Sequence, residues 1–137
     1  TTPSTAAIKA LKKFNIKKIA IFTPYSKKLN DEIINYFLSQ AFDVVANTYL
    51  DIAADYDIGK VDQNFLFKTL SQIEIKNADA LFISCTALPV LNIIERLEKE
   101  LGKPVITSNQ SLIWDTLESI GMNKDILGFG KLFNLDQ

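Results

Sequence analysis

The sequence predicts a single α/β domain with a four-stranded, mainly parallel β-sheet flanked by helices. Two observations support this fold class. Four short apolar runs alternate with segments whose apolar residues recur at helical spacing. The apolar runs are also continuous, which is typical of strands buried on both faces of a parallel sheet. A chain of 137 residues, 47% of them hydrophobic, is long enough to form one such domain with its own core.

The four apolar runs are the expected strands, and we expect each to be buried on both faces. Helical segments lie between successive strands, as the crossover connections of a parallel sheet require. This alternation predicts a Rossmann- or flavodoxin-like layered domain. The strands are expected at 18–23 (KIAIFT), 42–48 (FDVVANT), 80–84 (ALFIS) and 104–107 (PVIT).

Five further segments are expected to be helices, and their ends carry recognisable capping residues. Asp62 is placed to cap the third helix, and Gly102 follows the last turn of the fourth. Ser108 or Asn109 is the expected cap of the fifth helix. The helices are expected at 4–14, 28–40, 62–73, 89–101 and 109–120.

Two segments have no clear period. The segment 49–61 (YLDIAADYDIGKV) is a long irregular stretch inside a compact domain, and such stretches are often binding loops or lids. The tail 125–137 (DILGFGKLFNLDQ) is apolar enough to pack against the rest of the domain.

The residue types that the chain lacks exclude several kinds of site. With no histidine and one cysteine it has no Ser-His-Asp triad, no imidazole metal site, no internal disulfide and no CxxC motif. The GFG run at 128–130 lacks the third glycine and the preceding strand of a dinucleotide fingerprint. We therefore expect neither a metal nor a cofactor.

The charge pattern predicts neither a nucleic-acid nor a membrane partner. The net charge is −1, and Arg96 is the single arginine among 15 basic residues, which is a poor footprint for nucleic acid. No apolar run approaches the 18 or so residues that span a bilayer. A lone cysteine fits a reducing compartment, so we expect a cytoplasmic protein.

The candidate site lies after the first and third expected strands. Right-handed crossovers allow a strand order in which these two strands are neighbours, and ligands bind beyond the carboxyl ends of such strands. The residues that would face the same crevice are Tyr25, which follows the first strand, and Cys85, which follows the third. This expectation depends on the strand order.

Cys85 is the leading chemical candidate. It lies shortly before an expected helix, where free backbone N–H groups and the positive helix end favour a thiolate. The N–H groups of Cys85, Thr86 and Ala87 are candidates to hold a carboxylate or enolate oxygen. The Tyr25 hydroxyl is placed to donate to a carboxylate from the other side. The alternatives are that Cys85 is a small buried hydrophobe and that Tyr25 packs on its own helix start.

Four motifs in order then resemble a known family. They are TTPSTAAIKAL, IAIFTPYSKKLND, ADALFISCTALPVLNIIERLEKELGKPVITSNQSLIW and GFGKLF. Together they resemble the C-terminal half of the aspartate/glutamate racemase superfamily, nearest to its branch of maleate cis-trans isomerases and arylmalonate decarboxylases. The SCTAL and GKPVITSNQ runs are specific in combination, and Asn30, five residues after Tyr25, supports the match.

The resemblance implies a cofactor-independent, metal-free enzyme with two similar α/β lobes and an active site between them. It implies that Cys85 is catalytic, that Tyr25 contacts a substrate carboxylate, and that the amides of Thr86 and Ala87 help to form an oxyanion pocket. The chain 1–137 corresponds to one lobe, so we expect it to be the C-terminal half of a longer enzyme, completed by an N-terminal lobe or a partner chain. The resemblance leaves open whether the enzyme forms a homo-oligomer.

Three functions remain open at this point. The first is an isomerase or racemase of a small carboxylic acid, maleate isomerase-like, which uses Cys85 and an enediolate-stabilising pocket. The second is an arylmalonate-type decarboxylase, in which Cys85 alone supplies the proton. The third is a non-catalytic α/β binding module. A cysteine in the first lobe at the position equivalent to Cys85 would indicate isomerisation or racemisation, and a non-acidic residue would indicate decarboxylation.

Overall fold

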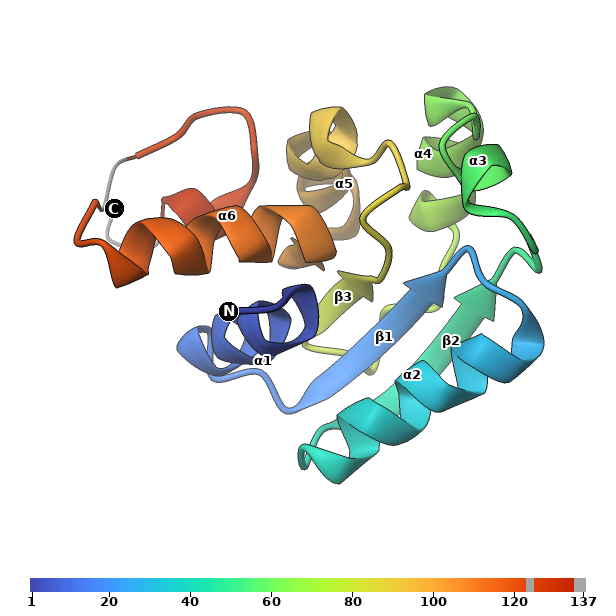
Figure 1. The fold of residues 1–137 in the computed structure, drawn as a ribbon, viewed down its shortest axis with the longest axis horizontal. Coiled ribbons are helices and arrows are strands. Elements are labelled where there is room, and N and C mark those ends of the chain that lie inside the picture. Colours follow the sequence, from blue (N-terminus) through green and yellow to red (C-terminus); the bar gives the residue numbers. More distant parts are fainter. Residues whose placement is uncertain (123–124, 135–137) are drawn as a thin grey trace.

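The computed structural model describes residues 1–122 and 125–134, and it confirms the α/β class (Figure 1). Helices and strands alternate along most of the chain. The elements in order are α1 (Pro3–Lys13), β1 (Lys18–Thr23), α2 (Lys27–Ser39), β2 (Asp43–Tyr49), α3 (Asp55–Ile58), α4 (Gln63–Ser71), β3 (Ala80–Ile83), the 3-10 turn η1 (Leu91–Ile93), α5 (Ile94–Leu101), β4 (Val105–Thr107), α6 (Ser108–Ser119) and the 3-10 turn η2 (Lys131–Phe133).

The four strands form one parallel sheet in the order β2-β1-β3-β4. The first and third strands are therefore neighbours, as the sequence analysis expected. Ile19 pairs with Ala80 and Phe22 with Ile83, so the two strands end at the same level. The segments that follow β1 and β3 consequently leave the sheet side by side.

Helices cover both faces of the sheet and enclose two apolar clusters. On one face α4 and α5 pack on the strands, and on the other face α1, α2 and α6 do. Continuous apolar strands place successive side chains in opposite clusters, which is why β1 and β3 are buried on both faces. Leu66, Leu70 and Leu97 are buried on the first face, and Leu11, Phe37 and Trp114 on the second.

Strand β2 differs from the prediction because it lies at the edge of the sheet. Its residues alternate between exposed and half-buried, so it is not buried on both faces. Its pairing also shifts by one residue: Ile19 pairs with Val44 and Ala20 with Ala46, which leaves Val45 between them as a bulge. The apolar run correctly predicted a strand here. The order of the strands in the sheet, which the run does not encode, decides that β2 has only one neighbour among the described strands.

The structure confirms the predicted cap of α4 but corrects the cap of α6 and the start of α5. Asp62 caps α4, and its carboxylate accepts the Phe65 N–H at 2.9 Å. Thr107 caps α6, rather than Ser108 or Asn109, and forms a capping box with Gln110. The segment expected to be helical from 89 instead forms a turn and η1, and α5 begins only at Ile94.

The segment 49–61 is less irregular than expected, since it contains the short helix α3. Before α3, the N–H groups of Leu50, Asp51 and Ile52 donate to the carbonyls of Thr23, Tyr25 and Pro24 at 2.9–3.1 Å. These hydrogen bonds extend the β1–β2 pairing past the end of β1. Figure 1 shows α3 on the side of the sheet toward which the strand arrows point.

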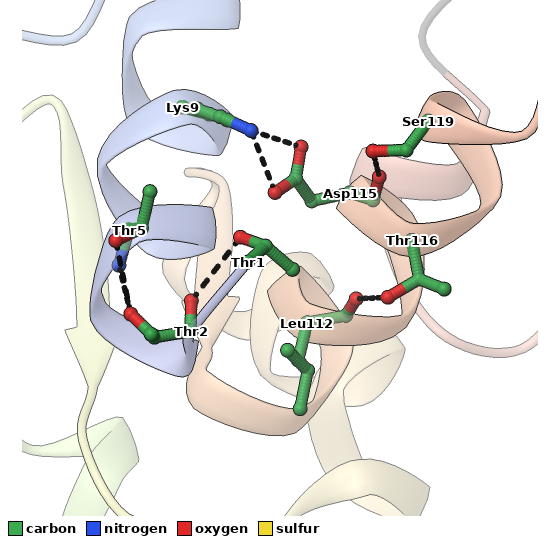
Figure 2. A network of polar contacts seen from close by, with 8 residues as sticks. All are labelled: Thr1, Thr2, Thr5, Lys9, Leu112, Asp115, Thr116 and Ser119. Carbon is green, nitrogen blue, oxygen red and sulfur yellow. Dashed lines mark hydrogen bonds and ion pairs between the residues drawn. The ribbon is translucent and has the colours of Figure 1, made fainter.

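Helices α1 and α6 lie against each other and are joined by an ion pair (Figure 2). The Lys9 ammonium contacts both carboxylate oxygens of Asp115 at 2.9 Å. Burial of Asp115 opposes its ionisation, but hydrogen bonds from Lys9 and Thr1 outweigh this and hold the pKa of that carboxyl below its usual range. The ion pair therefore ties α6 to the N-terminal helix.

The tail packs as the sequence analysis expected, as far as residue 134; the remainder of that segment, 135–137, lies outside the described residues. Leu132 and Phe133 are buried, and the Phe129 carbonyl accepts the Gln110 side-chain N–H. Glu98 on α5 accepts the N–H groups of Val105 and Lys131, at 3.0 and 2.9 Å. This carboxylate thus connects α5, β4 and the tail.

Among the helices of the described residues, none has the length and apolar character needed to cross a bilayer.

Substituting Gly130 tests how closely the tail packs. Gly130 and Gly128 both have positive φ, 85° and 89°, so alanine is strained at either position. A Cβ at Gly130 would lie 2.6 Å from Ile94 Cγ2, whereas a Cβ at Gly128 has no neighbour within 4 Å. We expect Gly130→Ala to lower the free energy of unfolding by about 1–3 kcal/mol more than Gly128→Ala, measured by urea denaturation. Equal losses would contradict this packing.

Candidate active site

The ends of β1 and β3 bring Tyr25 and Cys85 together. The Ser84 N–H donates to the Phe22 carbonyl at 3.0 Å, which continues the pairing of the two strands by one residue. Beyond that point Tyr25 packs against the apolar cluster that contains Cys85, and its phenol lies close enough to the side chains of Cys85 and Ser84 for both to act on its pKa. The two candidate residues therefore lie next to each other at the same edge of the sheet.

The Tyr25 phenol is held in its neutral form. Its half-burial is the main cause, because removing a phenolate from water is costly, and this raises the pKa of Tyr25 above its usual 10.0. The neighbouring Cys85 side chain and the negative charge of Asp55 raise the pKa of Tyr25 further, whereas the Ser84 side chain opposes them. Tyr25 is thus a hydrogen-bond donor throughout the neutral pH range.

Cys85 lies in a strained turn. Its φ is 132°, in the region that favours glycine, and the residue is 5% exposed. Its N–H donates to the hydroxyl oxygen of Ser108 at 3.1 Å. Its sulfur accepts the Ala87 N–H at 3.3 Å. The turn therefore folds back on the thiol and is connected to the first residue of α6.

This geometry changes the expected role of the backbone amides. Three N–H groups, of Cys85, Thr86 and Ala87, were expected to be free for a substrate oxygen. The Cys85 N–H is used by Ser108, and the Ala87 N–H points at the Cys85 sulfur. Among the described residues, the Thr86 N–H is the one of the three left without a hydrogen-bond partner. Thr86 itself is an exposed residue.

The helix that approaches Cys85 is also a different one. The sequence analysis expected the helix after Cys85 to begin shortly beyond it, but α5 begins only at Ile94. Helix α6 approaches the turn instead, because Ser108 and Asn109 in its first turn both contact it. The Asn109 side chain donates to the Thr86 carbonyl at 2.8 Å. The positive end of the α6 dipole therefore lies at the Cys85 turn.

Sequence reasoning treated Ser108 and Asn109 as capping residues and missed these contacts. The available signal was their position directly after the strand 104–107, because β4 is the neighbour of β3. Residues that follow neighbouring parallel strands meet at one edge of the sheet, so Ser108 and Cys85 were as predictable a pair as Tyr25 and Cys85.

A buried polar network supports the end of β1. The Thr23 hydroxyl donates to the Asn30 side-chain carbonyl at 2.8 Å, and Asn30 donates to Asn47 at 2.8 Å. Asn47 donates in turn to the Ile21 carbonyl at 3.2 Å. The network fixes the last residues of β1 against α2 and β2, and so fixes the point from which Tyr25 projects.

Helix α3 forms one wall beside the site. Ile58 is buried in the cluster that contains Cys85, and a Cβ built on Gly59 would lie 3.8 Å from the Ala87 carbonyl. The negative charge of Asp55 acts on Tyr25. The segment 49–61 thus lies where a binding loop would have to lie.

Two further features of the described residues bear on the choice of site. The described residues include no group of three or more His, Cys, Asp or Glu that could hold a metal ion. A cavity of about 400 Å³ lies between α5 and the tail, but neither Tyr25 nor Cys85 lines it. Its lining residues are Glu95, Glu98, Lys99, Gly102, Gly130, Lys131 and Asn134.

Comparison with known proteins shows a consistent set of similarities. The family model for arylmalonate decarboxylase matches residues 1–133. The chain is 28% identical over 130 residues to a maleate isomerase of Geobacillus stearothermophilus, covering 94% of this chain and 52% of that protein. It is 26% identical over 137 residues to an arylmalonate decarboxylase of Bordetella bronchiseptica, covering 98% of this chain and 57% of that protein.

A solved structure agrees with these matches. The maleate isomerase Iso of Pseudomonas putida S16 superimposes with a TM-score of 0.93 at 25% identity, over 96% of this chain and 54% of that one. The chain therefore spans about half the length of the curated relatives that it matches.

The strain at Cys85 can be tested by stability alone. Glycine normally destabilises a folded backbone by about 0.5–1 kcal/mol relative to alanine. At a φ of 132° the order should reverse, because glycine relieves strain of about 1–3 kcal/mol that alanine retains. We expect Cys85→Gly to be more stable than Cys85→Ala by about 1 kcal/mol in urea unfolding. A more stable Cys85→Ala would contradict the strained turn.

The raised pKa of Tyr25 predicts a loss of stability in alkali. Above pH 10.0 the unfolded chain loses the phenol proton while the folded chain keeps it. The stability that this phenol contributes is present in full below pH 10.0 and falls as the pH rises toward the folded-state pKa. Between pH 9 and about 11, we expect the wild type to lose more stability than Tyr25→Phe, in urea unfolding at both pH values. The control Tyr36→Phe should behave as the wild type.

Proposed function

The chain belongs to the arylmalonate decarboxylase family, and on that basis we propose that it is one lobe of a cofactor-independent enzyme that isomerises or racemises a small carboxylic acid. The observation that carries the proposal is the placement of Tyr25 beside Cys85 at the ends of neighbouring strands. In this proposal Tyr25 acts as a neutral hydrogen-bond donor and Cys85 as a nucleophile or acid–base group, which serve one face of a carboxylate substrate.

For a maleate-type isomerisation, the Cys85 thiolate adds to one alkene carbon. The C–S bond forms as the π-bond breaks, and the electron pair moves into the conjugated carboxylate to give an enediolate. Rotation about the remaining single bond follows. The electron pair then returns, the C–S bond breaks and the isomerised alkene is released with no net transfer of protons.

For a racemisation, the Cys85 thiolate removes the α-proton from one face, and an acid on the opposite face returns a proton to the same carbon. The intermediate is again an enediolate. In both reactions Tyr25 and the Thr86 N–H are the donors that stabilise the developing negative charge, and the α6 N-terminus adds a favourable dipole. Substrate contacts of Tyr25, Thr86 and Ala87 are part of this proposal.

In this proposal, groups outside the described residues of this chain serve the second face of the substrate. The curated relatives of this chain are about twice as long as the region that it matches. We therefore propose that an N-terminal lobe, or a partner chain, closes the crevice opposite Cys85 and provides the second acid–base group for racemisation.

A decarboxylase is the second candidate, favoured by the family model and by the Bordetella bronchiseptica relative. In that reaction carbon dioxide leaves from a disubstituted malonate, and the Cys85 thiol protonates the resulting enediolate. One cysteine is enough for this chemistry. Cys85 is followed by Thr86 rather than by a glycine. This slightly favours the isomerase and racemase members of the family over the decarboxylases.

We expect Cys85→Ala in the full-length enzyme to lower kcat at least about a thousandfold, because the group that reacts with substrate is lost. The assay follows maleate isomerisation, α-proton exchange in deuterated water and arylmalonate decarboxylation by proton NMR. Circular dichroism and urea unfolding show that the variant is folded. Turnover at the wild-type rate would remove Cys85 from the mechanism, and the substrate that the wild type converts decides between the candidate reactions.

Tyr25→Phe removes one hydrogen bond to the enediolate and leaves the ring in place. We expect kcat/KM to fall about tenfold to a hundredfold, with Tyr36→Phe unchanged as the matched control. An unaltered kcat/KM in Tyr25→Phe would exclude the hydroxyl from the site.

A further inference from the structure

We infer that Ser108 is a positioning residue: its hydroxyl holds the strained turn at Cys85 so that the thiol stays against Tyr25. The inference rests on the proposed function, because it concerns the same site. The inference adds Ser108 on α6 to Tyr25 and Cys85, which follow β1 and β3.

The conformation of Cys85 needs support from its surroundings. A residue with a side chain at a φ of 132° costs about 1–3 kcal/mol, and such a conformation persists only where other contacts enforce it. Without those contacts the turn would relax toward negative φ, and that rotation would carry the side chain away from its present position. The direction of the thiol therefore depends on what holds the backbone of Cys85.

Ser108 makes the contact closest to the strain. Its hydroxyl accepts the Cys85 N–H at 3.1 Å, and the Ser108 side chain and Cys85 are both about 5% exposed. Water therefore has little access to replace the hydroxyl. Removing it would leave a buried N–H unpaired, at a cost of about 1–3 kcal/mol. The unpaired N–H would destabilise the native turn. Rotation of the Cys85 backbone would relieve both this cost and the strain of its positive φ.

A second contact from α6 acts on the next peptide. The Asn109 side chain donates to the Thr86 carbonyl at 2.8 Å, so two consecutive residues of α6 hold two consecutive residues of the turn. Helix α6 is itself well fixed, by the Thr107–Gln110 capping box at its start and by the Lys9–Asp115 ion pair further along. The hydroxyl is thus presented from a rigid element.

The chain offers a matched control in Ser111. Ser111 is also a fully buried serine of α6, one turn further along, but its hydroxyl has no hydrogen-bond partner among the described residues. Ser108→Ala and Ser111→Ala therefore remove the same atom from the same helix. The first removes a hydrogen bond to the Cys85 turn and the second removes none.

The test measures turnover and thiol reactivity in the full-length enzyme. We expect Ser108→Ala to lower kcat by about tenfold to a hundredfold while KM changes by less than about threefold, because the reacting atom is misplaced. We expect iodoacetamide to label Cys85 at least about five times faster, since the relaxed turn exposes the thiol. Ser111→Ala should match the wild type in both measurements.

Two further variants separate positioning from a general loss of structure. Ser108→Thr keeps the hydroxyl, and we expect it to recover most of the kcat that Ser108→Ala loses. Asn109→Ala releases the Thr86 carbonyl, and we expect faster labelling of Cys85 in this variant too, which provides the test if Ser108→Ala does not fold. Impairment of Ser108→Thr equal to that of Ser108→Ala would overturn the inference.

The outcomes distinguish this inference from the proposed function. Labelling of Cys85 does not require turnover, so it reports on the turn even if the reaction is assigned wrongly. Full activity in Cys85→Ala would refute the proposed function and leave the labelling result standing. Wild-type kcat and wild-type labelling in Ser108→Ala, with Cys85→Ala inactive, would refute the positioning role alone.

Discussion

Cys85 adopts a φ of 132°, and the rest of the site depends on how that conformation is held. The Cys85 N–H is paired with Ser108, and the sulfur is paired with the Ala87 N–H. Together these contacts determine where the thiol lies relative to Tyr25. A strained residue at the end of a buried strand indicates that the turn was shaped for something other than stability, because glycine would be accommodated there at lower cost.

The parallel sheet makes this arrangement possible. Its order places β1, β3 and β4 side by side, so the segments that follow them leave at one edge. Each supplies a different part of the site: Tyr25 after β1, the strained turn after β3, and Ser108 at the start of α6 after β4. The polar network at Thr23 and the Lys9–Asp115 ion pair lie further away, but they fix the two elements that present Tyr25 and Ser108.

The proposed acid–base chemistry uses Tyr25 and Cys85, because the chain has no histidine. Burial and the neighbouring Cys85 raise the pKa of Tyr25, so its hydroxyl remains a donor. The donation of the Ala87 N–H to the sulfur and the positive end of α6 both favour negative charge at the turn. Under the proposed function, a further lobe or a partner chain would cover the second face of the reacting carbon.

The sequence by itself determined the fold class and most helix and strand positions, because periodicity and capping act over a few neighbouring residues, as at Asp62 and Gly102. It also pointed to Tyr25 and Cys85, since both lie within two residues of the end of an apolar strand. Only the tertiary structure decided that β2 is an edge strand, that α5 begins late, and that Ser108 holds Cys85 rather than capping α6. These properties depend on which strands are neighbours, and on the orientation of a hydroxyl 23 residues away in sequence, which local patterns do not encode.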